Sequence, residues 1–291
     1  WDVTFTGGDG QQSAWWVDYS GFQHGVGALG GGNVNLSSGR DLVDLTVVMP
    51  TSARVRGGRT IDEAKILELR NGGALTVNAG GSIRGGQYYI GRGAATLTAA
   101  ELTTGRTLEV TVQEYSLPYS LSLPLAPVLA IGDATMTVKT AGNLQVQTVA
   151  DPLLMPLPGV DELFGLGSYM SGYTGRTALT LTSVGGDVLL GGQTRHLSRS
   201  FDDVSDPSWP SMTSPKAGAG GGLYPAATRV TALSGSVVNR GLIRTMPNPD
   251  AEFRMLAERD VLPGTILMAR NKPASFPTPF QPHQGYGLNM S

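Results

Sequence analysis

Short segments in which apolar and polar residues alternate recur along the chain, each followed by a glycine-containing turn. In the stretch "NGGALTVNAGGSIRGG", Leu75 and Val77 precede Gly80–Gly81, and Ile83 follows them. A two-residue period places alternate side chains on one face of a strand, and glycine adopts positive φ in tight turns at little cost. This unit is therefore predicted to be a strand, a tight turn and a second strand.

The same unit returns at regular intervals. In four copies the first and last aliphatic or aromatic positions are eight residues apart: Val34 and Leu42, Leu75 and Ile83, Met136 and Leu144, and Phe253 and Val261. Two further copies, at Leu179 and Val230, fit with one residue gained or lost at the turn. The interval from Leu75 to the related Leu97 is 22 residues and that from Val230 to Phe253 is 23. The other intervals are 41, 61 and 43 residues, near multiples of about 20. Such a repeat of short strands predicts a parallel β-helix, or solenoid, with an antiparallel sandwich as the alternative.

Three stretches interrupt this rhythm. Residues 151–173 carry three prolines among bulky apolar residues, and residues 195–225 are polar and then rich in Pro and Gly. We therefore expect an all-β parallel β-helix over residues 1–271 with loop insertions at about 151–173 and 195–225. Residues 272–291 are predicted to form an extended, Pro-rich tail. Thr60–Glu63 matches a helix capping box, but the following "AKILELRNGG" is predicted to be a strand and a turn.

Composition narrows the class of protein. Only 15% of the residues are charged, against about 25% on average, and there are 41 glycines, which favours short strands joined by tight turns. The net charge of −2, without a run of Lys or Arg, predicts no nucleic-acid partner. No apolar run approaches the roughly 20 residues of a membrane-spanning helix, so no transmembrane segment is expected. The absence of cysteine removes disulfides, thiolate zinc sites and cysteine nucleophiles.

Several stretches carry a family resemblance. The segments "SAWWVDYSGFQHGVGALGGGNVNLSSGRDLVDLTVVMPTSARV", "LTVNAGGSIRGGQYYIGRG", "PVLAIGDATMTVKTAGNL" and "VTALSGSVV" resemble the C-terminal region of the filamentous-haemagglutinin family of outer-membrane exoproteins. The resemblance spans most of residues 1–270. It implies very long chains, secreted through an outer-membrane partner pore, that fold outside the cell as right-handed β-helices.

The resemblance also implies a function and partners. Members serve in adhesion, aggregation or biofilm matrix at the bacterial cell surface, and no catalytic residues come with the resemblance. Expected partners are a host-cell or matrix glycan or protein receptor, or like molecules in a fibre. The outer-membrane transporter would be the partner of the parent chain during its secretion.

One loop suggests a metal site. In "FDDVSDPSWP", the oxygens of Asp202, Asp203 and Asp206 could hold calcium, and Trp209 could form an apolar platform for a sugar ring. The spacing matches neither an EF-hand nor the repeats of calcium β-rolls, which favours a solvated acidic loop. No cofactor is therefore expected, with calcium as the alternative.

Aromatic residues suggest a ligand site near the start of the chain. Trp15, Trp16, Tyr19 and Phe22, with Tyr88 and Tyr89 further along, could bind a glycan through their ring faces. Alternation would turn only one residue of each adjacent pair inward, which favours one core residue and one packed beneath a loop. The glycine pattern Gly25–Gly30 is interpreted as a turn, because no helix is expected after it.

The sequence is compatible with two different functions. A structural or adhesive segment of a surface fibre agrees with the repeat and the low charge. The alternative is a β-helical polysaccharide lyase or hydrolase, which needs carboxylates arranged for catalysis. Asp41, Asp44 and Asp187 fall at or beside turns, where carboxylates more often accept backbone hydrogen bonds. We therefore expect no enzyme.

Overall fold

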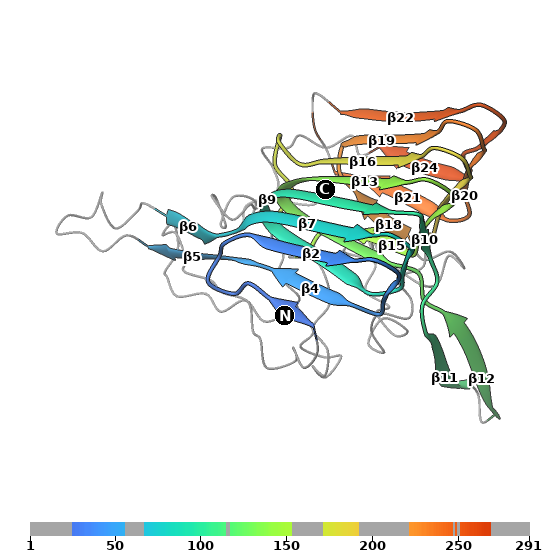
Figure 1. Ribbon diagram of the computed structural model, residues 1–291, viewed down its shortest axis with the longest axis horizontal. Coiled ribbons are helices and arrows are strands. Elements are labelled where there is room, and N and C mark those ends of the chain that lie inside the picture. Colours follow the sequence, from blue (N-terminus) through green and yellow to red (C-terminus); the bar gives the residue numbers. More distant parts are fainter. Residues whose placement is uncertain are drawn as a thin grey trace, which may run out of the picture.

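The computed structural model describes residues 25–55, 67–114, 117–152, 171–191, 221–246, 248 and 251–268. Throughout these residues the fold is all-β, with long parallel sheets and no helix (Figure 1). The prediction of an all-β chain built on parallel strands is thus confirmed. Every strand pairing in this part of the chain is parallel except those within two hairpins.

The largest sheet has ten strands. Its main path follows the order β1 (Val26–Gly27), β4 (Thr46–Met49), β9 (Gln87–Ala99), β13 (Val128–Thr140), β16 (Ala178–Ser183), β19 (Ala227–Ala232) and β22 (Glu252–Ala257). Off this path, β2 (Val34–Ser38) pairs with β7 (Gly73–Ala79), β7 also pairs with β9, and β15 (Thr148–Ala150) pairs with β13.

The second sheet has seven short strands in sequential order. They are β3 (Leu42–Val43), β8 (Ser82–Arg84), β10 (Glu101–Thr103), β14 (Leu144–Val146), β17 (Val188–Leu190), β20 (Val237–Asn239) and β23 (Val261–Leu262). A third sheet contains β18 (Gly221–Tyr224), β21 (Leu242–Thr245) and β24 (Thr265–Met268).

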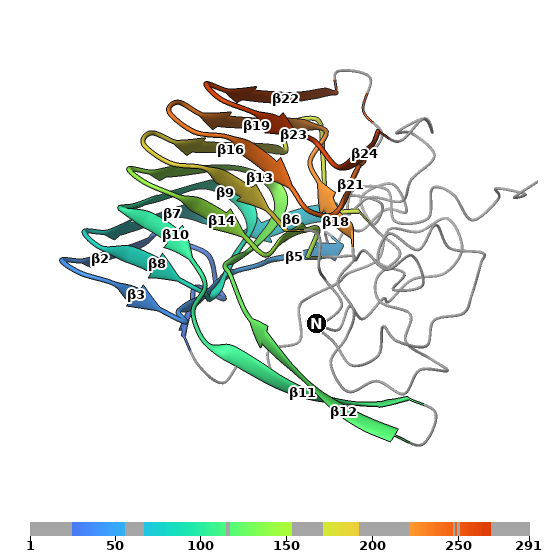
Figure 2. The same cartoon turned by 90° about the vertical axis from the view of Figure 1, so that its right-hand side faces the viewer.

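The chain passes through these sheets in a repeating order. A strand of the large sheet, such as β7, leads through a turn into a strand of the seven-stranded sheet, β8, and then back through β9. We call each such passage a circuit; successive circuits lie side by side from blue to red in Figure 2. This arrangement is compatible with a parallel β-helix.

Two long strands each serve two circuits. Residues Gln87–Ile90 of β9 pair with β4, whereas its residues from Gly93 onward pair with β7. The chain turns a corner between these halves, where Gly93 has a φ of 119°. A Cβ atom at Gly93 would overlap the carbonyl oxygen of Gly73 in the neighbouring circuit, so this corner requires glycine for both its conformation and its space.

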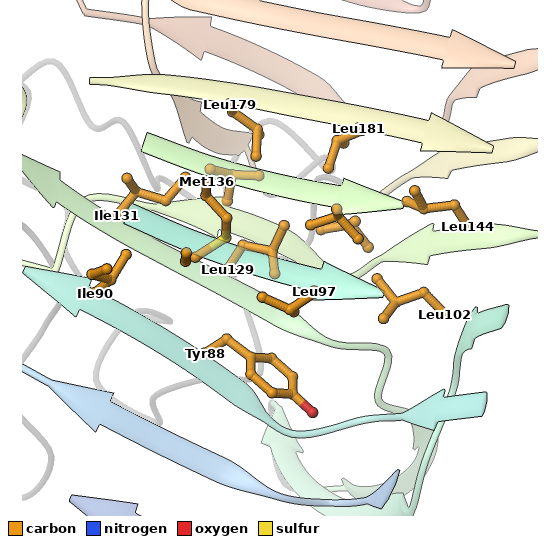
Figure 3. Packing of buried hydrophobic residues seen from close by; sticks show 14 of the residues in the cluster. Tyr88, Ile90, Leu97, Leu102, Leu129, Ile131, Met136, Leu144, Leu179 and Leu181 are labelled. Atoms are coloured by element: carbon orange, nitrogen blue, oxygen red, sulfur yellow. The ribbon is translucent and has the colours of Figure 1, made fainter. Parts of the chain in front are cut away.

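The core consists of apolar columns that run from circuit to circuit. Val77 pairs with Leu97, Leu97 with Val138, and Val138 with Leu181. Each of these side chains is at most 1% exposed, and Figure 3 shows Leu97 and Leu181 within the same packed cluster. The seven-stranded sheet contributes a facing column that includes Ile83, Leu102 and Leu144. Apolar burial along these columns therefore supplies the main stabilisation of the stack.

The observed strand pairing shows that the interval of 41 residues between repeat units was interpreted wrongly. Val34 pairs directly with Leu75, so their interval of 41 residues is one circuit and not two. The additional residues include an antiparallel hairpin of β5 (Thr51–Val55) and β6 (Leu67–Asn71). A second hairpin, β11 (Thr107–Glu114) and β12 (Leu117–Pro124), extends away from the stack (Figure 2). The predicted strand in "LELRN" is confirmed as β6, whereas the hairpins were not predicted.

Two inward positions were also misaligned. Ala95, not Leu97, pairs with Leu75, and Thr228, not Val230, pairs with Leu179. Ala95 and Thr228 do not resemble core aliphatic residues, although both side chains are buried. The hydroxyl of Thr228 donates to the carbonyl oxygen of Pro225 at 2.7 Å, and this bond allows a polar residue in the core column.

The turn glycines have a different role from the one predicted. Gly80, Gly81, Gly186 and Gly235 do not have positive φ, so conformational freedom does not explain them. They are instead close to the circuit beneath. A Cβ at Gly80 would lie 2.6 Å from the carbonyl oxygen of Gly39. Stacking at about 4.8 Å leaves no space for a side chain that points along the stack.

Candidate interaction surfaces

Most of the predicted site residues lie outside the described part of the chain. These are Asp202, Asp203, Asp206 and Trp209 of the acidic loop, and the aromatic residues Trp15, Trp16, Tyr19 and Phe22. Gly25–Gly30 is described: it contains β1 and a turn, and the next regular element is strand β2, not a helix.

Tyr88 and Tyr89 are both buried, so neither offers a ring face to a glycan. Tyr88 is 0% exposed and lies in the main core, as Figure 3 shows. Tyr89 is 3% exposed and packs with Val48 and Ala130 on the opposite face of the sheet. The alternation predicted for this pair is confirmed, and the idea of a glycan platform at these two residues is wrong. Burial also raises the pKa of Tyr88 above its ordinary value, with the nearby charge of Asp44 as a smaller cause.

The turn carboxylates accept backbone hydrogen bonds, as predicted. The Oδ1 atom of Asp41 accepts from the Ser82 amide at 2.7 Å, and that of Asp44 accepts from the Arg106 amide at 3.1 Å. Asp187 accepts from the Ser236 amide of the next circuit at 2.8 Å. Asp41 and Asp187 thus link one circuit to the next, and Asp44 reaches the circuit after the next, so the three carboxylates do not converge on a common site.

A buried carboxylate organises the corner between the halves of β13. Asp133 is 8% exposed, and its oxygens accept hydrogen bonds from the Thr174 hydroxyl at 2.6 Å and from Arg176. The Arg92 guanidinium lies 3.7 Å from the same carboxylate. The hydroxyl of Thr177 donates to the carbonyl oxygen of Gly132 at 2.8 Å. This pairing of the buried charge explains why the corner tolerates it.

A second buried carboxylate connects the two ends of the predicted insertion at 151–173. Asp151 is 1% exposed, and its Oδ2 atom accepts from the Ser171 hydroxyl at 2.8 Å and from the Gly172 amide at 2.7 Å. The adjacent Tyr173 donates its hydroxyl to the carbonyl oxygen of Leu223 at 2.6 Å. The residues on either side of positions 153–170 therefore meet at one point of the stack.

The outward face of the large sheet is rich in threonine. We define the threonine face as the outward positions of β2, β7, β16 and the second halves of β9 and β13. They are Asn35, Ser37, Ala74, Thr76, Asn78, Ala94, Thr96, Thr98, Thr135, Thr137, Lys139, Ala178, Thr180 and Thr182. Threonine occupies half of these positions, Lys139 carries the only charge among them, and none is aromatic. On β19 and β22, the next two strands of the sheet, the positions that follow Thr180 in the same column are Arg229 and Arg254.

The threonines of this face are aligned by the strand register. Thr76 pairs with Thr96, Thr96 with Thr137, and Thr137 with Thr180, which gives an unbroken column across four circuits. A parallel column contains Thr98 and Thr182 on either side of Lys139. This surface was not predicted from the sequence, because the predicted strands were aligned on their aliphatic positions. The signal was a repeated Thr-x-Thr, at 96–98, 135–137 and 180–182.

Hydroxyls on this face differ from those at the corners. Within the described residues, the face threonines have no side-chain hydrogen-bond partner, and all are exposed or half-buried. At the corners, by contrast, the hydroxyls of Thr140 and Ser183 both donate to the carbonyl oxygen of Gly142, at 2.7 Å. The face hydroxyls are therefore available to an external partner.

The last circuit forms a second surface. Val230 and Ala232 of β19 are 0% and 1% exposed, whereas their partners Met255 and Ala257 in β22 are half-buried. Further apolar side chains on β22, β23 and β24 are exposed, namely Leu256, Val261, Leu262, Leu267 and Met268. Each of these three strands pairs on one side only within the described residues, so the core is open at this end.

Within the described residues, no three His, Asp or Glu side chains gather as a set of metal ligands. Over the same residues no helix is long and apolar enough to cross a membrane. Comparisons with protein-family models, with curated proteins and with solved structures found no match to this chain.

Proposed function

We propose that this chain forms a right-handed parallel β-helix and is a segment of a large secreted surface exoprotein of the filamentous-haemagglutinin type. The segment would serve adhesion, aggregation or a biofilm fibre at the outer surface of a bacterium. Its partners would be a glycan or protein receptor, or like molecules in a fibre. The parent chain would reach the surface through an outer-membrane transporter.

One observation carries this proposal: the parallel pairing continues in register from β2 through β7, β9, β13, β16 and β19 to β22. Each circuit contacts mainly its neighbours, so the stack can be lengthened without a change in its geometry. A fibre segment needs length and stiffness, and an in-register ladder supplies both.

Two further observations support the proposal. The resemblance is densest over residues 13–55 and 72–93, and the second of these ranges covers β7, β8 and the first corner of β9. Among the residues that the structure describes, the outer edges of β22, β23 and β24 are unpaired and the core residues beside them are half-buried. Free edges of this kind favour association with further strands.

The size and location of the native polypeptide test this proposal. An antibody against residues 1–291 would probe extracts of the source cells and their culture fluid. We expect a band much larger than the 30.4 kDa of this chain, which protease removes from intact cells while a cytoplasmic marker survives. A free band near 30 kDa would contradict the proposal and favour the polysaccharide-degrading enzyme.

A further inference from the structure

The threonine face has a regular two-dimensional spacing. Successive circuits are about 4.8 Å apart, and alternate residues along a strand are about 6.6 Å apart. The positions in register, such as Thr96 beside Thr137 and Thr98 beside Lys139, therefore form a lattice and not an irregular patch. A partner that repeats on the same scale can contact many positions at once.

The side chains on this lattice are pre-organised. Threonine is β-branched, so its χ1 angle is restricted before any partner binds. Each threonine offers one hydroxyl, which both donates and accepts, beside one methyl group. Because little rotamer freedom is lost, weak contacts at many such positions can add up to useful binding.

Charge and composition narrow the class of partner. Thirteen of the fourteen positions of the face are uncharged, and the adjoining charges of Arg229, Glu252 and Arg254 are of both signs, so a charged polymer or an anionic lipid surface has little electrostatic complement there. The face has no aromatic side chain, so it offers no ring on which a sugar could stack. The complementary partner is therefore uncharged, periodic and able to exchange hydrogen bonds with hydroxyls.

Ordered water meets these conditions. In tetrahedral ice, two oxygens bonded to the same neighbour at about 2.8 Å lie about 4.5 Å apart, and the same geometry repeats the layers after about 7.4 Å. The first spacing differs from that between circuits by about 0.3 Å, and the second from that between alternate residues of a strand by about 0.8 Å. Over the three steps from Thr76 to Thr180, the mismatch along the stack accumulates to only about 1 Å.

From this match we propose that the threonine face binds the surface of ice. The methyl groups and hydroxyls order water in the lattice positions, and the ordered layer joins the crystal. Lys139 interrupts the second threonine column between Thr98 and Thr182, and its long charged side chain weakens the match at that point. The inference concerns the surface of this chain and does not depend on the proposed exoprotein.

The test is the fraction of the 291-residue protein that a slowly growing ice crystal takes up from dilute solution. The unchanged chain should enter the ice above the level of a non-binding protein. Thr137→Tyr combined with Thr180→Tyr should lower that excess about tenfold, because bulky rings lift the face away from the crystal. Lys139→Thr should raise uptake, since it completes the second column.

The matched control is Thr265→Tyr, at an exposed position of β24 outside the threonine face. It should leave uptake unchanged, and circular dichroism should show that all four proteins keep the same melting temperature. Exclusion of the unchanged protein from ice would overturn the proposal. Uptake that Thr265→Tyr lowers as much as the face variant does would overturn it as well. Binding to crystalline cellulose without uptake into ice would assign the face to a polysaccharide and also contradict it.

Discussion

The carboxylate of Asp41 occupies the space that a side chain on Gly81 would need. Its Oδ1 atom accepts a hydrogen bond of 2.7 Å from the amide of Ser82, the residue after Gly81. A Cβ at Gly81 would overlap this oxygen, and its next contacts, with the backbone of Arg40 and Asp41, would be 3.1 and 3.2 Å. The glycine of one circuit and the aspartate of the previous one are therefore a coupled pair.

The same relationship recurs at other turns. The Oδ1 atom of Asn143 accepts from the Asp187 amide at 3.0 Å, above Gly186, and Asp187 accepts from the Ser236 amide, beside Gly235. Where Ser82 replaces the Asx residue, the next circuit has Ala100 in place of glycine. At these turns an Asx side chain in one circuit occupies the space above which the next circuit has glycine, whereas Gly142 lies above the side chain of Glu101.

This coupling predicts a non-additive double-mutant cycle. Gly81→Ala should lower the free energy of unfolding by about 2 kcal/mol, because the alanine displaces the Asp41 carboxylate and leaves the Ser82 amide without its acceptor. Asp41→Ala alone should cost about 1 kcal/mol. Together they should cost at least about 1 kcal/mol less than the sum, as measured by urea denaturation.

Gly80→Ala is the control for this cycle. A Cβ at Gly80 would meet the backbone carbonyl of Gly39 at 2.6 Å, so Asp41→Ala should give no relief there. Equal coupling for Gly80 and Gly81 would show that the Asp41 side chain is not the cause.

Inward and outward residues alternate along each strand, so substitutions at adjacent positions should change the free energy of unfolding by different amounts. Leu97 is 0% exposed between Val77 and Val138, so Leu97→Ala should cost about 2–5 kcal/mol of the free energy of unfolding. Thr96 points outward, and Thr96→Ala should change stability by less than about 0.5 kcal/mol. Similar losses at both positions, measured by chemical denaturation, would contradict this register.

Two buried tyrosines should respond differently to removal of the hydroxyl. The Tyr224 hydroxyl is buried and has no hydrogen-bond partner in the described part of the chain, whereas that of Tyr173 donates to Leu223 at 2.6 Å. Tyr224→Phe should be neutral or stabilise by up to about 1 kcal/mol. Tyr173→Phe should destabilise by about 1–2 kcal/mol, because the Leu223 carbonyl loses its donor. The melting temperatures of the two variants check the difference, and a larger loss for Tyr224→Phe would contradict it.

Buried tyrosines also predict alkaline instability. Burial is the largest cause that raises the pKa of Tyr88, Tyr173 and Tyr224 in the folded chain, whereas in the unfolded chain tyrosine ionises near pH 10. The contribution of these tyrosines to the free energy of unfolding is fully present below about pH 10. It is lost as the pH rises above this value, because only the unfolded chain then releases protons.

The measurement is the free energy of unfolding between pH 8 and pH 11. Each buried tyrosine should reduce the free energy of unfolding by up to about 1.4 kcal/mol for every pH unit above the pKa of tyrosine in the unfolded chain. Tyr224→Phe should make this decline shallower. An unchanged slope in that variant would show that Tyr224 ionises equally in the folded and unfolded states.

The sequence predicted the parts of the fold that depend on short-range periodicity. Alternation at Leu75 and Val77, and the turn before Ile83, indicated the strands β7 and β8 correctly, because one buried face imposes a two-residue period. The alignment failed at Ala95 and Thr228, where a small residue and a hydrogen-bonded hydroxyl occupy core positions.

Features that depend on contacts between distant parts of the chain could not be predicted from the local sequence pattern. The hairpin β5–β6 lengthens one circuit to 41 residues, which coincides with twice the expected repeat of about 20. The need for glycine at Gly81 depends on Asp41 in another circuit, so it appears only once the register is known. The threonine face was visible as Thr-x-Thr, but its lattice also required the register.

The most direct test of the stacked register is a set of distances between spin labels. The chain has no cysteine, so a pair of introduced cysteines is labelled selectively. Asn35, Thr180 and Arg254 belong to one column of paired positions, with Thr180 four steps and Arg254 six steps from Asn35. At about 4.8 Å a step, the pairs Asn35→Cys/Thr180→Cys and Asn35→Cys/Arg254→Cys should give separations centred near 19 and 29 Å by pulsed electron paramagnetic resonance. Separations that do not increase from the first pair to the second, or that fall far from these values, would contradict the in-register stack.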